Sequence, residues 1–257
     1  MKKVLIKCGG SILDELSHDF FSSLHELKKS GYEVVIVHGG GPDINKMLEK
    51  LNVTPEYENG LRKTNEETLQ VVEMVLSGQT NRKLVQLLES HQLKAFGIHG
   101  SDNGILQGEL IDQKRLGFVG EVKEVNDEII HHLLQKNLIP VITPIATNKL
   151  GQKLNVNADY AAAAVAHALG VEHCIFVTDV VGILIDGELA RELTTDEVED
   201  NITNGKIYGG MIPKVQSALA ALEKGISSVM VVSGNSPFYQ QGKWLGTKIK
   251  RKEVMTK

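Results

Sequence analysis

Hydrophobic and polar residues follow two different periods along this chain. Short runs of apolar and β-branched residues, such as 4–6 and 33–37, alternate with segments in which apolar residues recur every three or four positions. The first pattern is typical of buried strands, and the second is typical of helices that pack on them. Their alternation predicts an α/β protein with a mainly parallel sheet.

The same patterns give approximate bounds for each element. Strands are expected near 4–6, 33–37, 94–98, 139–145, 173–178, 228–232 and 247–249. Helices are expected at 19–29, from Pro42 through Leu51, after a capping box at 64–67, and at 82–90, 126–134, 158–169 and 212–223. Asp186-Gly187 predicts a hairpin turn. The glycine-containing stretch 105–125 predicts hairpins, either a lid over a substrate or ordinary edge strands.

Composition narrows the class of protein. The chain has 257 residues, 42% hydrophobic and 23% charged, with a formal net charge of -4, which is ordinary for a globular protein. Clustered excess of Lys and Arg, which nucleic-acid and anionic-membrane binding require, is absent from the sequence. Cys8 and Cys174 are far apart, and no Cys/His spacing resembles a zinc site. Two lone cysteines, with no signal peptide or membrane span in the sequence, predict a cytoplasmic location.

Two glycine-rich segments each follow a predicted strand. Gly9-Gly10 comes directly after the first strand, and Gly39-Gly40-Gly41 comes after the second and before a helix. Glycine allows close backbone approach to a ligand, and a helix N-terminus favours anions. Two such loops at neighbouring strand ends predict an anion site at one edge of the sheet. The alternative is that each loop is an ordinary tight turn.

Two lysines lie beside such segments. Lys7 ends the first strand, and Lys214 lies near the start of a helix after Gly209-Gly210. The ordinary interpretation of each is a solvated surface charge. Neither the pattern G-x-x-x-x-G-K-[ST] nor G-x-G-x-x-G is present, so a P-loop enzyme or a standard dinucleotide-binding dehydrogenase is not supported.

Six ordered segments resemble the motifs of the amino acid kinase family and together cover essentially the whole chain. They are Lys-Cys-Gly-Gly-Ser at 7–11, His-Gly-Gly-Gly-Pro at 38–42, Asn-Gly-Leu-Arg-Lys-Thr at 59–64, Asn-Val-Asn-Ala-Asp at 155–159, Thr-Asp-Val-Val-Gly-Ile-Leu at 178–184 and Gly-Gly-Met-Ile-Pro-Lys at 209–214. The segments 59–64 and 155–159 favour the members that phosphorylate N-acetyl-L-glutamate over those that act on aspartate, glutamate, carbamate or uridylate.

The resemblance implies an αβα sandwich around an open, mainly parallel central sheet, with two lobes in one continuous fold. Residues 1–174 would bind the amino-acid substrate and form the dimer surface, and residues 175–257 would bind ATP. The implied roles are catalytic for Lys7, Lys214 and Asp159, substrate-binding for Gly40, Gly41, Arg62 and Asn155, and ATP-binding for Gly9, Gly10, Asp179, Val180, Val181, Gly182, Ile183, Leu184, Lys206, Ile207 and Tyr208.

The implied reaction moves the γ-phosphoryl group of ATP to a carboxylate. Because the acceptor is already an anion, no general base is required, and positioning and electrostatics carry most of the catalysis. Asp159 is expected between Lys7 and Lys214, holding both in place; its alternative role is a favourable charge at the start of the alanine-rich helix. Mg²⁺ is expected to be held mainly by phosphates and water, with no protein ligand.

Other interpretations remain open. The runner-up is a kinase for N-acetyl-aminoadipate or a carrier-protein-linked analogue, and a different class is a non-catalytic nucleotide-binding sensor. Cys8 is expected to fill space and His38 to be structural. Because the first strand begins almost at Met1, the resemblance also implies a homodimer that arginine does not inhibit.

Overall fold

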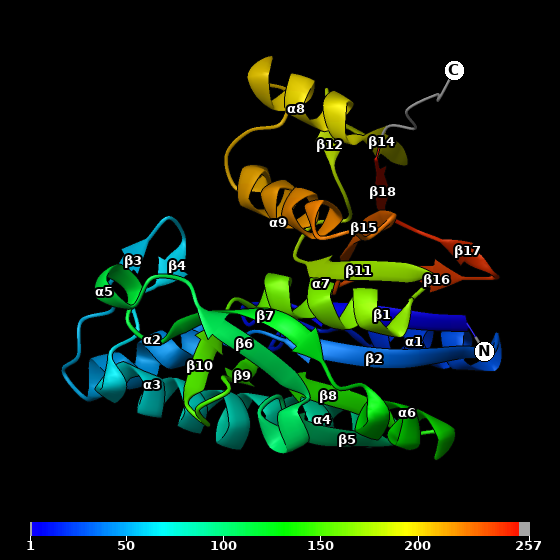
Figure 1. The fold of residues 1–257 in the computed structure, drawn as a ribbon. Helices are drawn as coiled ribbons and strands as arrows, with labels where there is room; N and C mark the ends of the chain where they lie inside the picture. The colour runs from blue at the N-terminus through cyan, green and yellow to red at the C-terminus, as the bar shows by residue number, and fades with distance from the viewer. Residues whose placement is uncertain (1, 252–257) are drawn as a thin grey trace, which may run out of the picture.

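A large open sheet is the frame of the computed structural model, which describes residues 2–251 (Figure 1). The strands in spatial order are β14 (Glu192–Thr194), β18 (Thr247–Lys250), β15 (Ser228–Ser233), β11 (His173–Thr178), β1 (Lys2–Cys8), β2 (Tyr32–His38), β8 (Ile139–Thr143) and β5 (Ala95–His99). All neighbours are parallel except β15 and β18. The predicted mainly parallel α/β fold is therefore confirmed.

Helices cover both faces of this sheet, which explains its nearly continuous apolar strands. On one face, α1 (His18–Lys29) and α4 (Asn81–Ser90) pack on Val4 and Ile6 of β1. On the other face lie α6 (Glu128–Gln135), α7 (Ala158–Leu169) and α9 (Met211–Glu223), in the cluster that includes Leu5. Alternation along β1 therefore places Lys7 on the same face as Leu5, the face that α7 covers.

Smaller elements are added to each end of the sheet. Four strands, β6 (Leu106–Leu110), β7 (Val119–Val125), β9 (Ile145–Thr147) and β10 (Lys153–Val156), close into a small barrel. Beside it lie α2 (Gly41–Lys50), β3 (Tyr57–Glu58), β4 (Leu61–Arg62), α3 (Glu66–Glu73) and a π-helix (Met74–Thr80). The C-terminal part adds α8 (Thr195–Thr203) and the hairpins β12 (Leu184–Ile185)/β13 (Glu188–Leu189) and β16 (Tyr239–Gln240)/β17 (Lys243–Trp244).

Several local predictions were wrong. The capping box at Thr64 is not formed, because Asn65 is the N-cap of α3 and accepts from the Thr68 N–H. Asp127 occupies the N-cap position of α6 without a side-chain cap, whereas the predicted cap, Asn126, does accept through Oδ1 from the Glu128 N–H at 3.3 Å. The stretch predicted as one strand at 139–145 is divided between β8 and β9.

The stretch 105–125 does form an antiparallel strand pair, as predicted, but its strands are not ordinary edge strands. A single helical turn, α5 (Gln113–Leu116), interrupts it, and both strands belong to the barrel. The π-helix and α8 were not predicted. Asp186 and Gly187 both have positive φ, as the predicted two-residue hairpin turn requires.

The predicted lobe boundary near residue 175 falls inside β11. This strand pairs with β1 on one side and with β15 on the other, so the sheet is continuous across the boundary. Figure 1 shows α8 and α9, in yellow and orange, on the far side of β11 from the barrel. Two lobes would therefore share one sheet.

The contact between the two glycine loops gives a test of the fold. A Cβ at Gly10 would lie 2.6 Å from the Gly40 Cα and 2.7 Å from its nitrogen, both backbone atoms that cannot move aside. We expect Gly10→Ala to lower the free energy of unfolding by about 1–3 kcal/mol, as overpacked sites do. Thermal unfolding of the purified variant measures this loss.

Gly9→Ala is the matched control, because its Cβ would meet no atom closer than 3.8 Å. Its melting temperature should stay near that of the wild type. Equal melting temperatures for the Gly9 and Gly10 variants would show that the loops do not touch in this way.

Candidate active site

The site lies where the central strands end. β1 pairs with β2 on one side and with β11 on the other, so the loop after β1 lies between the loops that follow those two strands. In open α/β sheets, ligands bind at this edge, where the chain leaves a central strand in both directions. Gly9-Gly10, Gly39–Gly41 and the segment beginning at Asp179 all meet there.

The two glycine loops touch each other directly. A Cβ at Gly39 would lie 3.3 Å from the Gly10 nitrogen, and a Cβ at Gly40 would lie 2.5 Å from Leu76 Cδ2 of the π-helix. Side chains at Gly10 or Gly40 are therefore excluded by packing, not by backbone conformation. The bare glycine backbone forms a wall between two cavities.

On one side of this wall is a cavity of about 190 Å³. Its lining includes all four residues predicted to bind the substrate, Gly40, Gly41, Arg62 and Asn155. The same cavity has apolar lining from Ile44, Leu76, Val119 and Pro144. It therefore combines one cation, an amide and an apolar wall, which suits a small anion that carries an acyl group.

Arg62 and Asn155 of this cavity are linked through Thr64. Asn155 Nδ2 donates to Thr64 Oγ1 at 2.9 Å, and that hydroxyl donates to the Arg62 carbonyl oxygen at 2.8 Å. Thr64 is fully buried. The residue predicted as a helix cap thus links β10 to the strand that carries Arg62.

On the other side of the wall is a second cavity of about 160 Å³. Its lining includes Lys7, Gly9, Asp179 and Lys214. Lys7 Nζ lies 2.6 Å from Asp159 Oδ1, and both side chains are largely buried, with exposed fractions of 16% and 15%. Two ammonium groups at the edge of a sheet form a site suited to phosphate.

The expected placement of Asp159 between both lysines is not what the structure shows. Lys214 Nζ instead lies 2.5 Å from Asp179 Oδ1, whose side chain is 59% exposed. The hydrogen bond from Lys214 holds the pKa of Asp179 below its ordinary value. The reason is geometric, since Lys7 is on β1, facing α7, while Lys214 is in the first turn of α9, beside the end of β11.

The N-terminus of α7 also clarifies the alternative role of Asp159. Asn157 is the N-cap, and its side chain accepts from the N–H groups of Asp159 and Tyr160. Asp159 lies in the first turn, where a negative charge is favourable. The helix position and the ion pair to Lys7 therefore coexist.

The residues predicted for the nucleotide are spread over different environments. Ile183 and Ile207 are buried in the core, with exposed fractions of 1% and 0%, and Val181 and Tyr208 are exposed. Lys206 Nζ lies 2.8 Å from Asp186 Oδ2 at the β12–β13 turn. Gly9 and Asp179 therefore line the second cavity together with Lys7 and Lys214. The side chains of Ile183 and Ile207 pack into the core instead.

Three further residues predicted to bind the nucleotide, Val180, Gly182 and Leu184, flank Val181 and Ile183 in the sequence. Val180 N–H donates to Thr178 Oγ1 at 3.2 Å, and Leu184 begins the β12–β13 hairpin. Gly182 has φ of 151°, and a Cβ there would lie 2.6 Å from Thr247 Oγ1. Gly182 therefore packs against β18.

His38 and Cys8 have structural environments. His38 is fully buried; its Nδ1–H donates to the Gly39 carbonyl at 3.0 Å, and its Nε2 accepts from Asn81 Nδ2 at 3.0 Å. Burial lowers the pKa of His38 to about 4, so the ring is neutral near pH 7 and braces the glycine loop. Burial raises the pKa of the Cys8 thiol to about 12, which fits a space-filling role and not a reactive one.

Sequence reasoning missed three residues at this site. Ser217 is one turn after Lys214 on α9, and its hydroxyl donates to Asp159 Oδ2 at 2.8 Å. Asn45 and Tyr57 both contact Arg62. The spacing of three between Lys214 and Ser217 is a signal that they share a helix face; nothing in the sequence indicates the other two.

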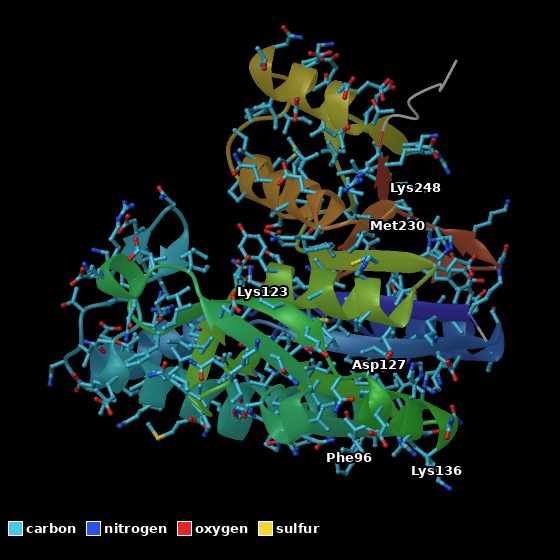
Figure 2. All side chains as sticks on the ribbon, in the orientation of Figure 1. Phe96, Lys123, Asp127, Lys136, Met230 and Lys248 are labelled. Carbon is cyan, nitrogen blue, oxygen red and sulfur yellow. The ribbon has the colours of Figure 1, made fainter. Side chains whose placement is uncertain are left out.

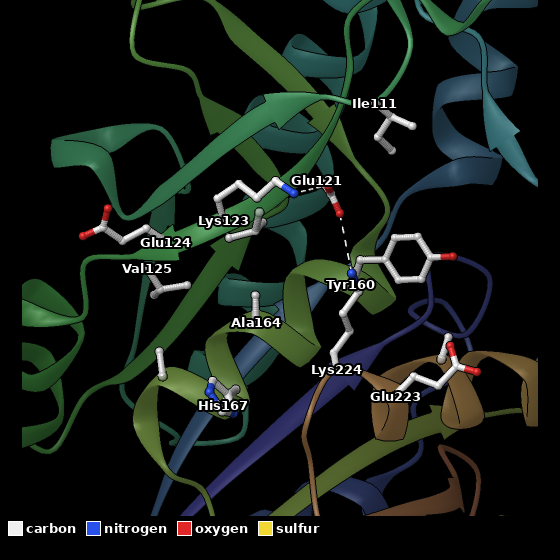
Figure 3. A pocket seen from close by; sticks show the side chains of 13 residues that line it. Ile111, Glu121, Lys123, Glu124, Val125, Tyr160, Ala164, His167, Glu223 and Lys224 are labelled. Carbon is white, nitrogen blue, oxygen red and sulfur yellow. Dashed lines mark hydrogen bonds and ion pairs between the residues drawn. The ribbon is translucent and has the colours of Figure 1, made fainter.

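A larger cavity, about 480 Å³, lies away from these residues between β7, α7 and α9 (Figure 3). Lys224, at the end of α9, reaches across it, and its Nζ lies 3.5 Å from Glu121 Oε2 on β7. Lys123 pairs with the same carboxylate. Among the described residues that line it, none belongs to either glycine loop.

The described residues hold no cluster of three or more His, Cys, Asp or Glu side chains placed to bind a metal ion. Across residues 2–251, no helix is both long and apolar enough to cross a membrane.

The fold and the two cavities place this protein in the class of α/β proteins whose anion sites lie at the carboxyl ends of parallel strands. Residues 2–233 match the model of the amino acid kinase family. The chain belongs to this family, and it is a kinase of amino-acid biosynthesis.

Individual relatives agree with this assignment. The acetylglutamate kinases of Geobacillus thermodenitrificans (strain NG80-2) and Geobacillus stearothermophilus are each 53% identical to this chain over 98% of its length, covering 97% and 98% of their own. The crystal structure of smu.665 from Streptococcus mutans UA159 is similar with a TM-score of 0.82, at 31% identity over 97% of this chain and 99% of that one. Carbamate kinase from Giardia lamblia, at 17% identity and a TM-score of 0.66 over 98% and 99% of the two chains, shares the fold.

Proposed function

We propose that this kinase transfers the γ-phosphoryl group of ATP to the side-chain carboxylate of N-acetyl-L-glutamate. The product is the acyl phosphate N-acetylglutamyl 5-phosphate, an intermediate of arginine biosynthesis. The observation that carries the proposal is the pair of cavities on either side of the glycine loops, one with a buried Arg62 and the other with two lysines. The names of the relatives support the choice of acceptor.

The chemistry follows from this division. Arg62 is suited to the α-carboxylate of the acceptor, because a guanidinium binds a carboxylate through two parallel N–H groups. Gly40, Gly41 and Asn155 would fix the rest of the acceptor, with its side-chain carboxylate directed past the glycine loops. That carboxylate is already a nucleophile, so the neutral His38 is not required as a base.

Lys7 and Lys214 would reduce the electrostatic repulsion between the acceptor carboxylate and the phosphates of ATP. Lys7 and Lys214 would stabilise the negative charge of the transferring phosphoryl group, and Asp159 would hold Lys7 in position. Gly9, Gly10, Asp179–Leu184 and Lys206–Tyr208 would hold the nucleotide. Residues 1–174 would thus form the acceptor lobe and residues 175–257 the ATP lobe.

Mg²⁺ would accompany ATP, partly neutralising its phosphates. Asp179, which lines the second cavity, is paired with Lys214, and Asp159 is paired with Lys7 of the same cavity. This pairing fits a metal held mainly by phosphate oxygens and water.

We propose a homodimer for the assembled enzyme. β5 is the last strand of the main sheet among the described residues, so its outer edge is open to a second copy, and Phe96 on it (Figure 2) is half-exposed. Molar mass in solution tests this, and a hexamer or a monomer would contradict it. A cytoplasmic location is proposed because both cysteines are unpaired thiols; cell fractionation tests it.

The acceptor can be tested directly. With MgATP, we expect N-acetylglutamate to stimulate ADP release more than N-acetyl-aminoadipate does, because the longer acceptor misplaces its carboxylate at the glycine loops. A single methylene changes selectivity by ~1–3 kcal/mol, so kcat/KM should differ about 10- to 200-fold. Faster release with N-acetyl-aminoadipate would favour the runner-up substrate. No ADP release with any acidic acceptor would favour a non-catalytic nucleotide sensor.

The two cavities predict different kinetic defects. Lys214→Ala should lower kcat by about 10²–10³ with little change in the KM for acetylglutamate, because it removes stabilisation of transition-state charge. Arg62→Ala should mainly raise that KM, about tenfold or more, because it removes a charged hydrogen bond to the acceptor. Steady-state kinetics in both substrates measures each effect.

Matched surface variants provide the controls. Lys224→Ala removes a lysine from the end of the same helix, and Arg115→Ala removes an exposed arginine that pairs with Glu58. Both should retain wild-type kinetics. If Lys214→Ala raises the KM for acetylglutamate while Arg62→Ala lowers kcat, the two cavities have been assigned in the wrong order.

A further inference from the structure

Arg62 is held by an unusual set of partners for a buried cation. Its side chain lies on β4, directly opposite Tyr57 of β3, and its Cζ lies 4.8 Å from the centroid of the Tyr57 ring. Arg62 Nη2 donates to Asn45 Oδ1 at 2.6 Å and to the Gly41 carbonyl oxygen at 3.4 Å. All of these partners are formally neutral.

Asn45 is the centre of this arrangement. Its Oδ1 accepts a second hydrogen bond, from the Tyr57 hydroxyl at 2.8 Å. Asn45 lies in the early part of α2, one helical turn after Gly41. A single amide oxygen therefore fixes both the guanidinium and the ring that covers it, and ties them to the glycine loop.

Among residues 2–251, no carboxylate forms an ion pair with Arg62. The nearby acids have other partners, since Glu58 pairs with Lys63 and Arg115, and Glu56 pairs with Lys63. Arg62 is only 8% exposed, and its buried Nη1 has no hydrogen-bond partner. Burial of an uncompensated charge is costly, so this arrangement needs an anion to offset it.

We propose that Asn45 and Tyr57 are positioning residues that orient Arg62 toward an anionic acceptor, and that Asn45 must be neutral to do so. This inference rests on the proposed function, because it assigns the Arg62 cavity to a carboxylate-bearing acceptor. An acid at position 45 would keep the hydrogen bonds but neutralise the guanidinium. The neutral amide holds Arg62 in place while leaving its charge for the substrate.

The decisive variants are Asn45→Asp and Asn45→Ala. Asp keeps the shape of Asn and the oxygen that accepts the two hydrogen bonds. Ala loses that oxygen but adds no charge. We expect the KM for acetylglutamate to rise about tenfold or more in Asn45→Asp, because the new carboxylate neutralises Arg62 and weakens its charged hydrogen bond to the substrate. The KM should rise less in Asn45→Ala. The kcat and the KM for ATP should stay near wild type in both.

A merely structural role for Asn45 predicts the opposite order. Asp would then be at least as good as Asn, and Ala would be the worst of the three. A KM for Asn45→Asp equal to or below that of Asn45→Ala therefore overturns the inference. If the wild-type enzyme releases no ADP with acetylglutamate, the proposed function fails instead, so the two failures are distinguishable.

Tyr57 supplies a second test that does not change charge. Tyr57→Phe keeps the ring over the guanidinium and loses the hydroxyl, while Tyr57→Leu loses both. We expect the KM for acetylglutamate to increase in the order wild type, Phe, Leu, with equal kcat. Calorimetric titration with acetylglutamate alone gives the same ranking as dissociation constants if the effect is on binding. Equal values for all three would show that Tyr57 does not position Arg62.

Asn45→Asp is expected to fold. Position 45 is half-buried near the start of α2, where a negative charge is favourable against the helix dipole. Thermal unfolding of each variant checks this. A defect in KM without a change in melting temperature assigns the effect to the site.

Discussion

The ion pair between Lys7 and Asp159 is the interaction on which the arrangement of this site depends. It joins the end of the central strand β1 to the first turn of α7, and both side chains are mostly removed from water. Breaking a buried pair by removing one partner is costly because it leaves an uncompensated charge. The pair therefore fixes where α7 begins relative to the glycine loops, and with it the position of Asn157 and of the strand that carries Asn155.

The second lysine is held very differently. Lys214 pairs with Asp179, whose side chain is 59% exposed, although the side chain of Lys214 itself is only 23% exposed. The Lys7–Asp159 pair is therefore largely shielded from water on both sides, whereas the Lys214–Asp179 pair is open to water on the carboxylate side. Ser217 hydrogen-bonds to Asp159 from the same helix as Lys214, so α9 is tied to the first turn of α7. In the proposed reaction, both cations would lie close to the transferring phosphoryl group and stabilise its negative charge.

The sequence was sufficient to predict most of the frame. Periodicity gave β2, β11, α7 and α9 to within one residue at each end, because both faces of the sheet are buried and the apolar pattern is strong. It gave β1 two residues short at each end. Strand ends followed by glycine predicted the edge that carries the site, and the family motifs predicted the residues that line the first cavity. Their roles in catalysis and binding remain predictions.

What the sequence could not give are contacts between segments distant in the chain. The partner of Lys214 depends on how α9 sits beside the end of β11, and the partners of Arg62 come from α2 and β3. The π-helix that closes on Gly40 was missed because its residues carry an ordinary helical pattern, and its widened turn is set by packing.

The most direct test is a crystal structure with acetylglutamate, Mg²⁺ and a non-hydrolysable ATP analogue bound together. The account predicts the α-carboxylate at Arg62, the nucleotide on the Lys214 side, and the acceptor carboxylate within about 3–3.5 Å of the γ-phosphorus, beside Lys7. An acceptor bound on the Lys214 side of the glycine loops, or a nucleotide phosphate at Arg62, would contradict it.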